Sequence, residues 1–472
     1  MTPLWTARDA AAATGGQAAV QWRATGVSID SRTISVGDLF VALRGPAHDG
    51  HDHVVAALKA GAAAAMVERR PADLPDDAPL LLVPDCQAGL EALGRAGRAR
   101  LNGKVIGLTG SVGKTGTKEM LLHMLRQQGK AAATAGNLNN HIGAPLTLAR
   151  MPQDTDYAVV ELGMNHPGEI RPISRMTRPN VALITRIAPA HTAFFPSLAA
   201  VATAKAEIFE GLEPEGTAVV NADDEFCGQL CQSAKQAGAA TILTFGQSPN
   251  ADARLVAVDL QPDHSMVSAT ILGRDLTYRL GAPGQHWVLN SLGALAAIAA
   301  IGADTDVAAA ALAGIHPPKG RGATESLLLP QGKVTLIDES YNASPAAMLA
   351  AFDVLTRHIP SRTGRRVAIL GDMLELGGQA AEAHAGLGKA LANLPVAAVF
   401  TAGLETPALV AQLRSDQRSG HWPTSKALAA EVVAMLRDGD IVLIKGSLGI
   451  GMAHVISALR EAASEKEQAD AV

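Results

Sequence analysis

The chain has 472 residues, a hydrophobic content of 48% and a formal net charge of −5. Its length predicts about three domains, its hydrophobic content excludes a disordered chain, and its acidic balance disfavours nucleic acid as the main partner. No apolar run reaches the ~18 residues of a membrane span, and no basic segment followed by an apolar block marks a signal peptide at the N-terminus.

The first predicted unit spans residues 1–101 and is a small α/β domain. Short apolar runs predict strands near 26–30, 38–43 and 64–68, and an Ala-rich helix at 53–64. Residues 71–80 are rich in Pro and Asp and predict a surface loop. The segment Asp49-Gly-His-Asp-His53 has the composition of a metal site, but we favour a polar turn.

The second predicted unit spans residues 102–316. Strands are predicted at 104–109, 157–162, 180–185, 217–221 and 241–245, with helices between them. This alternation is typical of a doubly wound, mostly parallel sheet. Residues 253–280 alternate apolar and polar side chains and predict an antiparallel meander, and an Ala-rich helix follows from His286 to about Ile301.

The cysteines indicate a cytoplasmic protein whose thiols are reduced. Cys227 and Cys231 lie four residues apart on a predicted helix, and no histidine near them completes a zinc site. With Cys86, they are expected to be core or surface thiols.

The third predicted unit spans residues 317–472, after a Pro- and Gly-rich junction from His316 to Gly322. Strands near 333–338, 366–371, 396–400 and 440–445 alternate with helices, which predicts a Rossmann-like α/β domain. The polar tail from about residue 464 is expected to fray. The fold class is therefore α/β in three domains.

A glycine-rich turn between an apolar strand and a helix is the most informative motif, Thr109-Gly-Ser-Val-Gly-Lys-Thr115. Its glycines let backbone N–H groups converge on an anion, and the next helix directs its free N–H groups to the same place. Leu108 stands where the longer form of the motif has Gly. A nucleoside triphosphate is therefore predicted to bind at Gly110, Ser111, Val112, Gly113, Lys114, Thr115 and Gly116, with Mg²⁺ on the Thr115 hydroxyl.

Three ionisable residues follow the phosphate loop in the second unit. Glu161 ends a strand, where it fits a Mg²⁺ ligand better than a carboxylate at a helix N-terminus. His191 follows the next strand and is either a structural histidine or a second metal ligand. The spacing around Lys205 indicates only a lysine on the solvated face of a helix.

Polar loops at other strand ends are candidates for ligand binding. Asn137, Asn139 and Asn140 crowd one short loop, and their amides can bond sugar hydroxyls or a pyrophosphate. In the third unit Asp338 can accept from ribose hydroxyls, and Asp372 repeats the design of a strand followed by a carboxylate. We expect these two to face the nucleotide across a cleft.

The order and spacing of these motifs resemble the Mur ligases over nearly the whole chain. The matching segments are Asp30–Arg32, Gly37–Phe40, Thr109–Thr115, Asn137–Pro145, Glu161–Asn165, Ala190–His191, Ala204–Lys205, His286–Asn290, Gly320–Arg321, Asp338–Asn342, Gly371–Gly377 and Lys445–Ser447. Tyr341-Asn342 and the segment GDMLELG are most similar to the branch of the family that adds D-alanyl-D-alanine to UDP-N-acetylmuramoyl-tripeptide.

This resemblance implies an ATP-dependent ligase of peptidoglycan precursor synthesis that works through an acyl phosphate with two Mg²⁺ ions. The partners implied are those two small molecules, and a monomer is expected. The implied roles are uridine contacts from Ser31 and Arg32, metal binding by Glu161 and His191, a carbamylated Lys205 at the second ion, adenine near His286 and Asn290, and nucleotide phosphate and ribose contacts from Arg321 and Asp338. Lys114, Lys205 and His191 would be catalytic, and Tyr341, Asn342, Asp372 and the three asparagines would bind substrate.

Some positions depart from the family pattern, and two other functions stay open. The departures are Gly116, Arg186, the segment Thr192–Pro196, Trp287 and Leu448. One alternative is a related amide ligase with another substrate, such as one that adds glutamate to folate. Asp30-Ser-Arg32 argues against the folate members, which lack the uridine-binding domain. The other alternative is a non-catalytic regulator that binds a UDP-sugar and ATP.

Overall fold

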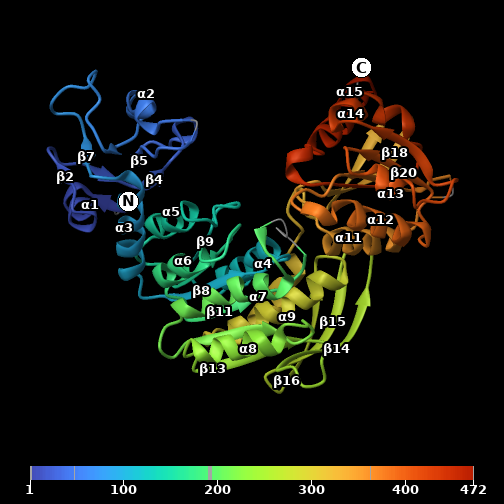
Figure 1. Ribbon diagram of the computed structural model, residues 1–472, viewed down its shortest axis with the longest axis horizontal. Coiled ribbons are helices and arrows are strands. Elements are labelled where there is room, and N and C mark those ends of the chain that lie inside the picture. The colour runs from blue at the N-terminus through green and yellow to red at the C-terminus, as the bar shows by residue number, and fades with distance from the viewer. Residues whose placement is uncertain (1–2, 47, 190–193, 362, 471–472) are drawn as a thin grey trace.

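The computed structural model describes residues 3–46, 48–189, 194–361 and 363–470. Each predicted unit is built on one large β-sheet. Figure 1 shows the N-terminal domain (blue) and the C-terminal domain (orange to red) at opposite ends of the central domain, both on the same side of it. The expected α/β class is confirmed. We propose the domain limits 101/102 and 316/317, which leave one large sheet in each part.

The N-terminal domain is built on a five-stranded sheet that is parallel except at one edge. Its order is β2 (Gln17–Ala18), β7 (Leu80–Leu82), β6 (Ala64–Val67), β5 (Asp38–Val41) and β4 (Gly26–Ser28), with β2 antiparallel to β7. A small pair, β1 (Trp5–Thr6) and β3 (Arg23–Ala24), and the helices α1 (Ala7–Thr14), α2 (Val54–Lys59) and α3 (Cys86–Ala99) complete it. The three predicted strands are confirmed. β1, β2 and β3, of two residues each, are too short to give a periodic signal, and β7 begins at the last residue of the loop predicted at 71–80.

The segment from Asp49 to His53 is the polar turn that we favoured. Asp49 caps the short 3₁₀ helix Gly50–His53 by accepting from the backbone N–H of His51 at 3.0 Å. Its carboxylate also lies 2.6 Å from Nδ1 of His51, while Nε2 of that ring accepts from the N–H of Glu68. The polar groups of the turn thus satisfy one another.

The central domain contains a nine-stranded sheet in the order β16-β15-β14-β13-β12-β11-β8-β10-β9. The strands are β8 (Lys104–Thr109), β9 (Ala131–Ala133), β10 (Tyr157–Glu161), β11 (Val181–Ile184), β12 (Thr217–Asn221), β13 (Thr241–Gly246), β14 (Ala253–Leu260), β15 (Ser265–Ile271) and β16 (Arg274–Leu280). Neighbours are parallel from β9 to β14, and β14, β15 and β16 form the predicted antiparallel meander.

Both faces of this sheet are covered by helices. The helices are α4 (Lys114–Arg126), α5 (Gly143–Arg150), α6 (Ile170–Thr177), α7 (Leu198–Ala206), α8 (Cys227–Gln236), α9 (Gln285–Ala300) and α10 (Thr305–Ala311). Ile106 packs into the core beneath α4 and α9, and its neighbour Val105 packs into the core beneath α5 to α8. A strand that is buried on both faces has a nearly continuous apolar sequence, and this is why β8 could be predicted from the sequence.

The C-terminal domain contains a six-stranded sheet in the order β17-β18-β22-β19-β20-β21. The strands are β17 (Ala323–Leu329), β18 (Gly332–Glu339), β19 (Arg366–Gly371), β20 (Ala398–Ala402), β21 (Arg418–Trp422) and β22 (Ile441–Lys445). The helices are α11 (Pro345–Arg357), α12 (Ala380–Ala392), α13 (Pro407–Val410), α14 (Ser425–Met435) and α15 (Ala453–Asp470). The fraying expected from residue 464 is wrong, because α15 continues to Asp470.

The N-terminal domain is fixed to the central domain by buried bonds. The indole N–H of Trp5 donates to the carbonyl of Ala149 at 2.9 Å, and Nε of Arg150 donates to the carbonyl of Val27 at 2.6 Å. On the other side, α9 meets α11, since a Cβ on Gly284 would lie 3.0 Å from Cγ2 of Val354. Within the described ranges, no helix is both long and apolar enough to cross a membrane.

Candidate active site

The phosphate loop joins β8 to α4 and needs both of its flanking glycines. Gly113 has φ +85°, and a Cβ there would lie 2.7 Å from Nδ2 of Asn290. A Cβ on Gly110 would lie 1.9 Å from Oγ1 of Thr185. No side chain caps the start of α4, so its first N–H groups stay available to an anion.

Lys114 folds back over this loop. Its Nζ donates to the carbonyl of Gly110 at 2.6 Å. Burial lowers the pKa of Lys114, the negative charge of Glu161 opposes that shift, and the positive charge of Arg321 adds to it. Arg321 comes from the junction before β17, so the third unit already contributes charge to the loop.

Glu161 is the centre of a buried polar group beneath the loop. It is 1% exposed, its Oε2 accepts from Oγ1 of Thr115 at 3.2 Å, and its Oε1 accepts from Nδ2 of Asn139 at 2.7 Å. In the part of the chain that the structure describes, no Lys, Arg or His forms an ion pair with it. A buried carboxylate beside a hydroxyl, with neutral donors only, is a donor set that fits a hard divalent cation.

Glu161 does not cap the N-terminus of the helix that follows it, α6. The start of α6 is held instead by Glu207, whose carboxylate accepts from the backbone N–H groups of Gly168 and Arg171 at 2.8 and 3.0 Å. Both hydrogen bonds that Glu161 accepts come from side chains. Its carboxylate is therefore oriented toward the loop.

Lys205 lies in the last turn of α7 and is 2% exposed, so the solvated-face interpretation is wrong. The Ala-rich helix packs closely on the sheet, which buries a lysine that its spacing alone cannot place. Burial lowers the pKa of Lys205 well below its ordinary value, and the positive charge of Lys114 lowers it further. The two lysines therefore share one site.

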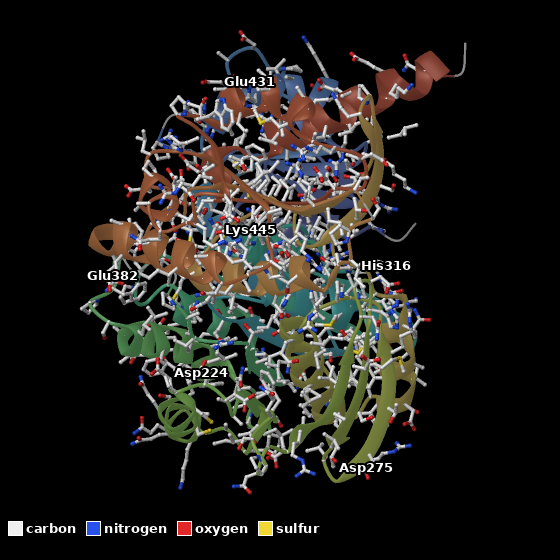
Figure 2. The ribbon with its side chains drawn as sticks, turned by 90° about the vertical axis from the view of Figure 1, so that its right-hand side faces the viewer. Asp224, Asp275, His316, Glu382, Glu431 and Lys445 are labelled. Atoms are coloured by element: carbon white, nitrogen blue, oxygen red, sulfur yellow. The ribbon has the colours of Figure 1, made fainter. Side chains whose placement is uncertain are left out.

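His191 lies outside the described residues, as do the first two residues of the departure from Thr192 to Pro196. The backbone just before it is held in place. The N–H of Ser111 donates to the carbonyl of Arg186, and Asp224, labelled in Figure 2, accepts from the N–H of Ile187 at 2.6 Å. Arg186 thus supports the phosphate loop through its backbone, a role that any residue can fill.

The three asparagines of one loop have different positions. Asn139 bonds Glu161, whereas Asn140 accepts from the N–H groups of Ile142 and Gly143 and holds the turn into α5. Asn137 is exposed. Only Asn137 and Asn140 have side chains open to a ligand on the surface of this loop.

Residues of α9 connect the loop to the third domain. The ring of Trp287 packs against α4, since a Cβ on Gly116 would be 2.9 Å from Cη2 of the indole. Burial lowers the pKa of His286, and the charge of Glu339 opposes that shift. The Gly116 and Trp287 departures therefore belong together, because the absent side chain makes room for the indole.

The carboxyl ends of the strands in the third unit hold a second polar group. The Arg321 guanidinium stacks on the Tyr341 ring at 3.9 Å. Lys445, inside the C-terminal domain in Figure 2, donates to Oε2 of Glu339 at 2.8 Å and to the carbonyl of Asn342 at 3.0 Å. These bonds order the loop that follows β18.

Asp338 and Asp372 are both buried, and the carboxylate of each already has partners within the protein. Asp338 accepts from the hydroxyl of Ser340 at 2.7 Å and lies 3.4 Å from Arg460. Asp372 accepts from the backbone N–H groups of residues 404, 405 and 406, at 2.8, 3.1 and 2.8 Å. Substrate binding by Asp372 needs correction, because three N–H groups already use its oxygens to hold the start of α13.

Ser31 and Arg32 lie in a short 3₁₀ helix of the N-terminal domain. The side chain of Arg32 is 86% exposed and bonds Asp30, which lowers the pKa of Asp30 to about 2. These residues belong to the N-terminal domain, which lies at one end of the molecule in Figure 1, whereas the phosphate loop belongs to the central domain.

Two residues near Glu161 were not identified from the sequence. The hydroxyl of Thr134 accepts from the N–H of Glu161 at 3.0 Å, and the buried Lys118 donates to the carbonyl of Thr134 at 2.8 Å. Lys118 lies three residues after the phosphate-loop motif, in α4, where its spacing alone does not tell that it is buried. Thr134 follows the short strand β9 and carried no usable signal.

Comparison with known proteins gives matches over most of the chain. Three models of one family match: the Mur ligase middle domain over residues 108–298, the Mur ligase, glutamate ligase domain over 327–448, and the Mur ligase family, catalytic domain over 23–93. Among curated relatives, the UDP-N-acetylmuramoyl-tripeptide--D-alanyl-D-alanine ligase of Escherichia coli is 35% identical, over 92% of this chain and 93% of its own. The ligase of that name from Bacillus subtilis is 34% identical over the same shares.

Solved structures agree with these matches. MurF from Acinetobacter baumannii superposes with a TM-score of 0.84 at 30% identity, covering 97% of this chain and 99% of that one. MurF ligase from Thermotoga maritima, in complex with ADP, superposes with a TM-score of 0.77 at 26% identity, covering 93% and 98%.

Proposed function

The chain belongs to the Mur ligase family, and we propose on that basis that it joins D-alanyl-D-alanine to UDP-N-acetylmuramoyl-tripeptide at the expense of ATP. The product would be the UDP-linked pentapeptide of peptidoglycan precursor synthesis, with ADP and phosphate. The observation that carries the proposal is the buried group of Thr115, Glu161 and Asn139 beneath a phosphate loop. A buried carboxylate without an ion-pair partner among the described residues, beside a hydroxyl at a phosphate loop, fits a divalent cation bound with the ATP phosphates.

The phosphate loop is proposed to hold the ATP phosphates. The free N–H groups of residues 110–116 and the ammonium of Lys114 would bind them, while His286 and Asn290 would lie toward the adenine. Thr115 and Glu161 would hold Mg²⁺, with His191 and Lys205 at a second ion. When bound, the metal neutralises charge between the phosphate and the attacking carboxylate.

Lys205 is proposed to act as a carbamate. The lysine ammonium would first lose a proton; the neutral amine would then add to CO₂, forming an N–C bond and releasing a second proton, so that a buried cation is replaced by a carboxylate. Burial favours the neutral amine that this addition requires. The new carboxylate would lie beside Lys114, so a repulsive pair would become an attractive one.

Substrate contacts are proposed at both ends of the molecule. Ser31, Arg32 and Asn137 would bind the nucleotide acceptor, and Tyr341 and Asn342 would contact the reacting end. Arg321 and Asp338 would approach the nucleotide phosphate and ribose. A cavity of about 340 Å³ lies between residues 195–198 and 376–379, on the two domains that would close around the acyl phosphate.

The reaction itself needs positioning more than acid–base chemistry. The tripeptide carboxylate attacks the γ-phosphorus, ADP leaves, and the amine of the dipeptide then attacks the acyl carbon and expels phosphate. We further propose that the protein works in the cytoplasm as a monomer.

The test is product analysis with purified protein. ATP, D-alanyl-D-alanine and UDP-N-acetylmuramoyl-tripeptide, with diaminopimelate or lysine as its third residue, are supplied together and then one at a time withheld. We expect phosphate and the pentapeptide mass only with all three. Phosphate release that does not need the dipeptide, or binding without any product, would overturn the proposal.

A further inference from the structure

Lys118 is a lysine in the second turn of α4 that is fully buried. Its Nζ donates to the carbonyl of Thr134 at 2.8 Å and to the carbonyl of Gly136 at 3.0 Å, and it lies 3.1 Å from Oε1 of Glu119. Two of the ammonium protons have carbonyl acceptors, and the carboxylate of Glu119 balances the charge. Burying a charge is costly unless it is paired in this way, so this lysine has a specific task.

The two carbonyls that Lys118 binds begin the loop that holds Glu161. The hydroxyl of Thr134 accepts from the backbone N–H of Glu161 at 3.0 Å. Five residues later, Nδ2 of Asn139 bonds Oε1 of the same side chain, and the carbonyl of Asn139 accepts from the N–H of Gly163 at 2.7 Å. Segment 134–139 therefore encloses Glu161 from its backbone to its carboxylate.

Besides Lys118, the start of the segment is tied to β10 by the N–H of Thr134, which donates to the carbonyl of Val159 at 3.0 Å. The segment leaves β9, an edge strand of three alanines, and Gly136 takes a left-handed conformation with φ +54°. Asn137 is exposed. The ammonium of Lys118 joins the two carbonyls on either side of Ala135, which fixes the direction in which the chain leaves the strand.

We propose that Lys118 is a positioning residue for metal binding by Glu161, and that it acts through segment 134–139. The inference rests on the proposed function, since it assumes that Glu161 holds the ion. The ammonium of Lys118 bonds the carbonyls of Thr134 and Gly136 and not the carboxylate of Glu161, so its effect passes through Thr134 and Asn139. Partners of this kind commonly change metal affinity or activity about 10- to 100-fold when they are lost.

The test measures Mn²⁺ binding by electron paramagnetic resonance, with the full chain and ADP present. Lys118→Met keeps the length of the side chain and removes the charge, and we expect Mn²⁺ affinity to fall about 10-fold or more. Turnover should then need more free Mg²⁺ for half-maximal rate at constant nucleotide, while the affinity for ADP without metal stays the same.

Arg98 supplies the matched control. It is a buried cation that donates to the carbonyls of Thr177 and Arg178, at 2.7 and 2.8 Å, away from the loop. Arg98→Met should lower the melting temperature as Lys118→Met does, but leave Mn²⁺ affinity unchanged. Equal Mn²⁺ affinity in Lys118→Met and the wild type, or equal losses in both variants, would overturn the proposal.

A second pair keeps the test decisive if Lys118→Met fails to fold. Thr134→Val removes the hydroxyl that accepts from Glu161, and we expect it to weaken Mn²⁺ binding several-fold, whereas Thr134→Ser should not. Glu161→Gln distinguishes a failure of the proposed metal site from a failure of the positioning role of Lys118. If wild-type Mn²⁺ binding does not depend on Glu161, the proposed metal site fails, whereas dependence on Glu161 without any effect of Lys118 or Thr134 removes only the positioning role.

Discussion

The hydroxyl of Thr115 donates to Oε2 of Glu161 at 3.2 Å, across 46 residues of chain. Parallel pairing of β10 with β8 sets Glu161 beside Leu108, one residue before the strand turns into the phosphate loop. The first turn of α4 then brings the Thr115 hydroxyl back over the end of β10. Two oxygens of the kind that Mg²⁺ prefers are thereby placed together by sheet register.

Glu161→Gln should abolish metal binding without harming the fold. We expect turnover to fall about 100- to 1,000-fold, because the charge that holds the ion is lost. The melting temperature should stay equal or rise, since a buried carboxylate without a cationic partner destabilises the apoprotein. Calorimetry and Mn²⁺ binding measure both effects. Glu207→Gln is the control, and it should lower stability, because two backbone N–H groups depend on that carboxylate.

Lys114→Met should weaken ADP binding and lower turnover about 100-fold, because the loop loses its point charge. Isothermal calorimetry with ADP and a phosphate-release assay measure these effects. Lys130→Met, which removes an exposed lysine of the same domain, should change neither. Normal ligation by the Lys114 variant would show that the phosphate loop is assigned wrongly.

Lys205→Ala should lower turnover about 100-fold, and added formate or acetate should restore part of it by supplying the missing carboxylate. Wild-type activity should also fall in CO₂-depleted buffer and return with bicarbonate. Lys235→Ala, on the exposed face of α8, should behave as the wild type, with the same dependence on CO₂ and no gain from added acid. An active Lys205 variant that no acid improves would contradict the carbamate.

Asp372→Ala should act on stability and leave recognition alone. Three backbone N–H groups lose a charged acceptor, and we expect a loss of about 3 kcal/mol in the free energy of unfolding of the C-terminal domain. The KM for D-alanyl-D-alanine should not change. Urea titration and steady-state kinetics measure the two quantities, and a raised KM with normal stability would restore the substrate-binding role.

The thiol of Cys227 should react slowly at neutral pH. Burial and the nearby thiol of Cys231, with Sγ atoms 4.0 Å apart, raise the pKa of Cys227 to about 11. Because only the thiolate is nucleophilic, alkylation by iodoacetamide should rise about tenfold per pH unit between pH 7 and 10. Peptide mass spectrometry follows the rate. Cys86, fully buried with a pKa near 12, should stay unmodified while the protein is folded.

Sequence patterns predicted most strands that are buried on both faces and missed several at the edges of the sheets, the seven-residue β17 among them. Strands such as β8 and β11 are continuous apolar runs because helices cover both faces of their sheet. β9, with three alanines, and β21, with the polar sequence Arg-Ser-Gly-His-Trp, lie at the edges of their sheets, where no such run is required. The burial of Lys205 was missed for a different reason. An Ala-rich helix has no apolar stripe that distinguishes its buried face from its exposed face.

The sequence by itself determined the order of the elements, the phosphate loop and the family, because backbone geometry at Gly110 and Gly113 and apolar periodicity are local properties. Only the tertiary structure decided which polar groups at strand ends meet. Asp372 and Glu161 look alike along the chain, yet the first caps backbone N–H groups and the second stays free of them. Strand order and packing make that difference, because they bring together residues that are far apart in the chain.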